Sequence, residues 1–158
     1  MRTLLGTFEI AFDDLDKRGR ELIMLVGPEM LYERPSDDNR MYAVASVGEA
    51  ILRSAAVVEI VFNGLTTRMW DDPFEWTLPE KLSTPELVIE YLDETVATRK
   101  RGFAFLQTDG DLQRSLPAPI KMLTIAEILV DALAKAEHFE GRASAIYEIL
   151  TAKALPRR

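Results

Sequence analysis

The sequence predicts an all-α protein that folds as one four-helix bundle over residues 1–158. Three observations support this prediction. Apolar residues recur at helical spacing in four long stretches, each stretch has recognisable start or stop signals, and no segment alternates polar and apolar residues for long enough to indicate a sheet. Helices that carry one apolar stripe each bury those stripes most simply against one another in a bundle.

The first expected helix covers residues 4–26, where apolar residues recur at helical spacing and charged residues occupy the opposite face. The pair Gly27-Pro28 ends this helix. The second expected helix, residues 46–70, begins at Ser46. The hydroxyl of Ser46 can cap the helix while Glu49 reaches back to the Ser46 backbone, which makes a capping box.

The third expected helix covers residues 84–106 and opens with Pro85, whose missing N–H costs nothing at the first helical position. The fourth, residues 124–150, opens with a second capping box between Thr124 and Glu127. Each of these helices therefore has a defined first turn.

Three long connections join these helices: residues 27–45, 71–83 and 107–123, about 13 to 19 residues each. Simple up-down bundles need only about 2 to 8 residues between helices. A chain of 13 residues can span about 40 Å, enough to run the length of a helix and start the next one in a parallel direction. We therefore expect crossover connections.

The composition excludes several classes of protein. The chain has no cysteine, which excludes a disulfide scaffold and any thiolate metal site. Its 19 basic and 26 acidic residues give a net charge of −7 without a long basic run, so we expect no nucleic-acid partner. No stretch approaches the roughly 20 apolar residues of a membrane span, and Glu9 and Asp13 interrupt the apolar N-terminus. We expect a cytoplasmic protein with no membrane partner.

The opening of the second helix and one pattern in the fourth helix carry a resemblance to a known family. Ser46 to Glu49 reads S-x-G-E, and Gly141, Ala145 and Tyr147 form a small-residue pattern. In their order and spacing, these segments resemble the DinB/YfiT-like superfamily of bacterial four-helix-bundle proteins. The resemblance covers nearly the whole chain.

The resemblance implies an up-down-down-up bundle with long crossover connections that assembles as a homodimer. In active members it also implies a metal site of three histidines. One histidine lies on the second helix, and two lie on the fourth helix, spaced H-x-x-x-H just before the glycine. Some members are thiol-dependent transferases.

This chain departs from the family pattern at the metal site. Alignment on Ser46 to Glu49 and on Gly141 places the three ligand positions at Arg53, Lys135 and Phe139. Two permanent cations and a phenyl ring supply none of the neutral nitrogens that a metal needs. We therefore expect no metal and no other cofactor.

The sole histidine, His138, could rescue a metal site only with nearby carboxylates. It lies one residue before Phe139 and so points about 100° away from that ligand position around the helix. The possible carboxylate partners are Glu59, Asp131, Glu137 and Glu140.

Three interpretations of the substituted site remain open. Arg53 follows Glu49 by four residues and Lys135 follows Asp131 by four, so both cations can form ordinary solvated helix pairs. Alternatively, the four charges form an ion-pair cluster in one crevice, over an apolar floor made by Phe139. In the third interpretation the two cations form a pocket for a small anionic ligand, a carboxylate or a phosphate.

Two classes of function follow. The first is a metal-free protein that binds a small ligand or assembles with a second copy of itself. The alternative is a thiol-dependent S-transferase or metal-dependent hydrolase of the DinB-like family that uses non-standard ligands.

The segment 69–76 holds three aromatic side chains, which suit either a lid or partner site, or the anchoring of a long loop onto the bundle.

Overall fold

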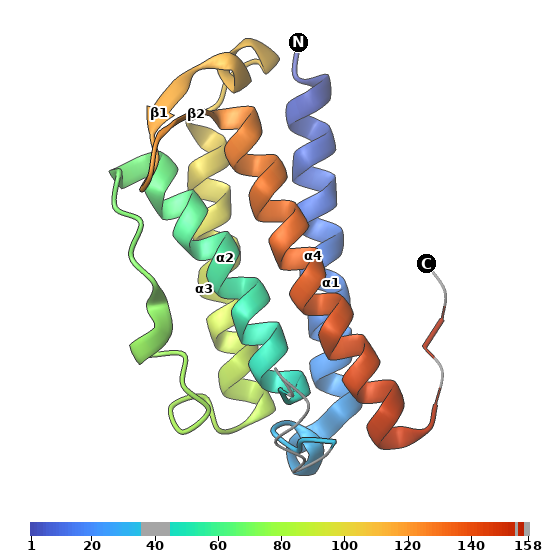
Figure 1. Cartoon of the computed structure of the whole chain (residues 1–158). Coiled ribbons are helices and arrows are strands. Elements are labelled where there is room, and N and C mark those ends of the chain that lie inside the picture. Colours follow the sequence, from blue (N-terminus) through green and yellow to red (C-terminus); the bar gives the residue numbers. More distant parts are fainter. Residues whose placement is uncertain (36–44, 154, 157–158) are drawn as a thin grey trace.

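The computed structural model describes residues 1–35, 45–153 and 155–156, and the bundle predicted from the sequence is confirmed (Figure 1). The described residues form four long helices, two 3₁₀ turns and one short hairpin. Their bounds are α1 (Thr3–Met30), α2 (Val47–Thr67), η1 (Pro73–Glu75), α3 (Pro85–Ala104), η2 (Asp109–Gln113), β1 (Ser115–Pro117), β2 (Met122–Thr124) and α4 (Ile125–Thr151).

The local signals in the sequence fix where the helices begin. Ser46 and Glu49 form the expected capping box, and so do Thr124 and Glu127. Pro85 occupies the first position of α3, after Thr84 accepts a hydrogen bond from the Leu87 N–H. These caps satisfy N–H groups that lack partners within the helix.

The end of α1 differs slightly from the expected one. Helical geometry resumes beyond Gly27 and continues to Met30, but Gly27 itself has φ 65° and ψ −179°. This backbone conformation is open almost only to glycine. Gly27 therefore kinks the chain at the point where the sequence predicts the helix to stop.

The helices form a ring in which α2 packs most extensively against α4 and α3, and α1 packs against α3 and α4 (Figure 1). The N-terminus of α1 lies beside the end of α3, since the N–H of Asp109 donates to the carbonyl of Met1 at 2.9 Å. At the other end of the bundle, the N–H of Gly48 donates to the carbonyl of Leu31 at 2.8 Å. Figure 1 shows that α4 starts at the hairpin end, beside the start of α1. Hence α1 and α4 run one way, and α2 and α3 run the opposite way.

One connection runs along the outside of the bundle, between the end of α2 and the start of α3 (Figure 1). Trp70, at its beginning, packs so closely on Gly64 that a Cβ there would lie 2.1 Å from the indole ring. The indole of Trp70 thus fastens the connection to α2, in the anchoring role considered for this aromatic segment.

The expected crossover is found only between α2 and α3. The ends of α1 and α2 that are connected meet at Leu31 and Gly48, and the connection between α3 and α4 likewise joins neighbouring ends, so the prediction of crossovers is wrong for these two connections. The connection between α3 and α4 folds into η2 and a hairpin in which Leu116 pairs with Leu123. Strands of three residues are too short for polar and apolar alternation to reveal, which is why the sequence predicts no strand here. Residues 36–44 of the first connection lie outside the described part of the chain.

The core consists of two apolar clusters stacked along the bundle axis. The first lies toward the hairpin end and centres on the mutually packed rings of Phe12, Phe62 and Phe103. The second lies at the opposite end and includes Ile23 and Ile51. Polar side chains line the small central hollow described below, to which both clusters contribute walls.

Helix α2 is the one described helix that is long and apolar enough to cross a membrane, with a mean hydropathy of 1.3. Half of the most apolar 18-residue stretch of α2 is buried inside the bundle. The sequence predicts no stretch that approaches a membrane span, and the difference arises because α2 buries apolar side chains against both α3 and α4.

Candidate functional site

An open hollow lies between α2, the connection that follows it, and α4. Its volume is about 380 Å³, within the range of ligand pockets. We call it the Arg53 cleft. It is lined by Glu49, Leu52, Arg53, Ala56, Val57, Ile60, Asp72, Phe74, Thr77, Leu78, Pro79, Glu80 and Phe139.

Helical periodicity explains which α2 residues reach the cleft. Leu52, Ala56 and Ile60 follow one another at four-residue spacing, and Arg53 and Val57 lie beside them on the same face. The connection supplies the opposite wall, and Phe139 enters from α4. The cleft therefore has a largely apolar floor with one cation in its wall.

The structure brings together three of the six candidate site residues predicted from the sequence. Arg53, Phe139 and Glu49 line the Arg53 cleft. Lys135 and Asp131 do not line it, and they pair with each other across one turn of α4 at 2.7 Å, each side chain 60% exposed. This pair is the solvated helix pair of the first interpretation.

His138 is exposed on α4, and its ring lies against that of Phe139 with centroids 5.6 Å apart. Among the described residues, no three His, Cys, Asp or Glu side chains are gathered closely enough to hold a metal ion. Arg53 and Phe139 offer no metal-binding atom, so the side chains present in the Arg53 cleft do not fit a three-histidine metal site.

Glu49 does not pair with Arg53, although the four-residue spacing allows it. One carboxylate oxygen accepts from Arg34 at 2.8 Å, and the other accepts from the backbone N–H and hydroxyl of Ser46. Burial alone would raise the pKa of Glu49, but these hydrogen bonds outweigh burial, so that the pKa is lowered. Glu49 is thus an ionised carboxylate already engaged by other groups.

Arg53 has no ion-pair partner among the residues that the structure describes, and its side chain is exposed. Two further acids, Asp72 and Glu80, lie on the connection and line the cleft. Their charges disfavour a ligand with several negative charges. The cleft therefore suits a single acidic group attached to an apolar body.

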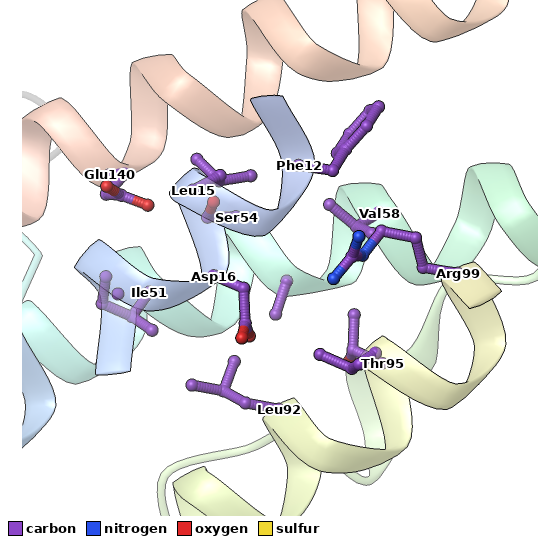
Figure 2. A pocket seen from close by; sticks show the side chains of 13 residues that line it. Phe12, Leu15, Asp16, Ile51, Ser54, Val58, Leu92, Thr95, Arg99 and Glu140 are labelled. Carbon is purple, nitrogen blue, oxygen red and sulfur yellow. The ribbon is translucent and has the colours of Figure 1, made fainter. Parts of the chain in front are cut away.

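A second hollow, of about 30 Å³, lies inside the bundle (Figure 2). It is large enough for water and too small for an organic ligand. Around it lie Asp16 from α1, Ser54 from α2, Thr95 and Arg99 from α3, and Glu140 from α4 (Figure 2).

Charged pairs that tie α1 to its neighbours surround this central hollow. Arg99, whose side chain is 5% exposed, donates to Asp13 at 2.7 Å. Arg18 donates to Glu140 at 2.8 Å and also binds Glu137. No fully buried side-chain nitrogen or oxygen in the described part of the chain lacks a hydrogen-bond partner. The polar interior is therefore a satisfied structural network.

From the sequence, Glu140 is predicted only as a possible metal ligand, and Arg99 is not predicted as a functional or structural residue. A signal for both was present. Ala132, Ala136 and Ala143 mark the buried stripe of α4, and Glu140 falls in that stripe. In the same way, Arg99 falls in the buried stripe of α3. A charge inside an apolar stripe indicates an interior ion pair.

No family model matches this chain, and no curated protein or solved structure matches it either.

Proposed function

We propose that the protein is a metal-free, DinB-like bundle that binds a small amphipathic monocarboxylate in the Arg53 cleft. The observation that carries this proposal is the position of Arg53. Arg53 lies in the wall of an apolar-floored cleft, and no carboxylate of the described residues pairs with its guanidinium.

Two features of the cleft define the ligand: the guanidinium of Arg53 and the largely apolar floor. A guanidinium binds a carboxylate through two parallel N–H donors, which gives both charge and orientation. Leu52, Val57, Ile60 and Phe139 supply apolar surface for an alkyl or aryl body. Because Asp72 and Glu80 repel additional negative charge, one carboxylate suits the cleft better than a phosphate with two charges.

The assignment to the DinB-like superfamily is part of this proposal. It is supported by the S-x-G-E opening of α2 and by the helix directions, in which α2 and α3 run opposite to α1 and α4. The expected homodimer and cytoplasmic location belong to the same proposal. Sedimentation that gives a mass near 17.8 kDa at tens of micromolar protein would contradict the dimer.

Calorimetric titration with octanoate, octanol and octylammonium tests the ligand class. We expect octanoate to bind the Arg53 cleft more tightly than octanol. Arg53→Gln should weaken octanoate binding by about 10-fold to 100-fold, since a hydrogen bond to a charged group contributes about 1.5–3 kcal/mol.

The matched control is Lys135→Gln, which removes an exposed cation outside the cleft. It should leave octanoate binding unchanged. Equal binding of octanoate by the native protein and the Arg53→Gln variant, or the absence of saturable octanoate binding, would overturn the proposal.

A further inference from the structure

A larger groove, of about 920 Å³, runs between α1 and α4 on another part of the molecule. It shares no residue with the Arg53 cleft. Small side chains on α4 help to create it. A Cβ built on Gly141 would meet no atom within 4 Å, and Ser144 lies one turn further along the same wall.

One wall of the groove is apolar and open. Met24 and Leu25 on α1 line it and are 69% and 57% exposed, which is unusual for neighbouring large apolar side chains of one helix. Leu22 adds buried apolar surface beside them. This wall offers an apolar body a substantial contact surface.

The C-terminal tail covers part of the groove. Helix α4 ends at Thr151, and the next residue, Ala152, has a left-handed conformation with φ 53°, so the chain turns back. The N–H of Leu155 then donates to the carboxylate of Glu148 at 2.9 Å. The half-buried side chain of Leu155 packs against the second core cluster, the one that includes Ile23 and Ile51. Three segments of the chain therefore form the groove.

The charges that line the groove are mainly negative. Among the described residues, four acidic and two basic ones line it, and one of the basic ones, Arg20, is already paired with Asp16 and Asp93 outside the groove. Arg18 faces Glu137 and Glu140. Both guanidiniums are therefore already engaged, unlike that of Arg53, whereas Glu148 forms no ion pair within the described part of the chain. The groove for this reason favours a cation over an anion.

We propose that this groove, which we call the tail groove, binds a small amphipathic cation: a protonated amine on an apolar body. The amine lies near the carboxylate of Glu148 on α4, and the body lies on Met24, Leu25 and Leu155. A second copy of the chain is a poorer occupant, because the tail covers part of the surface and two acidic surfaces repel each other.

The test uses octylammonium, with octanol and octanoate as matched probes of the same length. We expect the native protein to bind octylammonium at least about 10-fold more tightly than octanol. Glu148→Gln keeps the oxygen that accepts from Leu155 but removes one charge. It should weaken octylammonium binding by about 3-fold to 10-fold and leave octanol binding unchanged.

Gly141→Leu fills the groove, and the open space at Gly141 allows the new side chain without disturbing the fold. It should weaken octylammonium binding by at least about 10-fold. The control is Gly6→Leu, because Gly6 also faces open space in α1 but lines neither the tail groove nor the Arg53 cleft. Gly6→Leu should bind octylammonium as the native protein does.

Three results would overturn this inference: equal affinity for octanol and octylammonium, full octylammonium binding by Gly141→Leu, or a dimer that Gly141→Leu converts to a monomer. The last result would assign the groove to self-association. Octanoate binding, measured in the same variants, reports separately on the Arg53 cleft.

Discussion

At the residue scale, the interior charges fix how the helices fit together. Glu140 and Arg99 are both nearly buried, and each pairs with a residue of α1. Desolvation offsets much of the Coulombic attraction in such pairs, so their net contribution to stability is small. Their effect is on alignment, because shifting α1 along the bundle would separate buried charges from their partners.

Gly27 permits a sharp test at this scale. Gly27→Ala should lower the free energy of unfolding by about 1–3 kcal/mol, because alanine is strained at φ 65° and ψ −179°. Urea denaturation followed by circular dichroism measures the change. Gly6→Ala is the control: Gly6 lies in regular helix with open space around it, so alanine there should raise stability by about 0.5–1 kcal/mol. A loss of the same size in both variants would exclude backbone strain at Gly27 as the cause.

At the scale of the elements, α2 organises the molecule. It packs against both α3 and α4, and it supplies one wall of the Arg53 cleft. Its first turn is set by Ser46, which is fully buried. Ser46 accepts from the N–H of Glu49, and Glu49 accepts from the N–H of Ser46. The direction in which α2 enters the bundle therefore depends on this capping box.

Removing this cap should weaken the whole fold. Ser46→Ala should lower the free energy of unfolding by about 0.5–2 kcal/mol, since the orphan N–H of the first turn loses its acceptor. Guanidinium denaturation measures the change. Thr7→Ala is the control, because the hydroxyl of Thr7 is exposed and bonds only within its own helix. Identical midpoints for native protein and Ser46→Ala would contradict a stabilising cap.

At the scale of the whole molecule, several carboxylates link stability to pH. Hydrogen bonds lower the pKa of Glu49 against the opposing effect of burial. Backbone hydrogen bonds lower the pKa of Asp109, Asp111 and Glu127. Glu59 has the opposite shift, because burial raises its pKa although Tyr91 donates to it at 2.6 Å. The fold therefore favours the ionised state of four of these carboxylates and disfavours it only for Glu59.

Acid should therefore destabilise the protein. A carboxyl whose folded pKa is lowered contributes stability above its unfolded pKa of about 4.3, and loses that contribution as the pH falls through the folded value. The stability difference between native protein and Glu49→Gln should shrink from pH 7 to pH 3 in urea denaturation. Glu90→Gln, which alters an exposed carboxylate in the second turn of α3, is the control. A difference that stays constant with pH would rule out Glu49 as a source of the acid sensitivity.

The sequence predicts the local part of this structure well and the cleft only in part. The helix starts follow from capping boxes and from Pro85, which are signals within four residues. Periodicity places Arg53 on α2 and Phe139 on α4, but the cleft also needs the wall built by residues 72–80. No local pattern encodes the path of that connection, and so the sequence could not separate Arg53, which faces the cleft, from Lys135, which pairs in solvent.

The contact between Trp70 and Gly64 gives the protein a built-in optical reporter. The chain has two tryptophans, and they lie in different surroundings: the Trp70 indole packs on α2, whereas Trp76 is 64% exposed. Iodide should quench the emission of Trp76 readily and that of Trp70 poorly while the connection is docked. Release of the connection from α2 would then shift the emission of Trp70 to longer wavelength and increase its quenching by iodide. The far-ultraviolet circular dichroism of the helices would stay constant. Opening of the Arg53 cleft could in this way be followed separately from unfolding of the bundle.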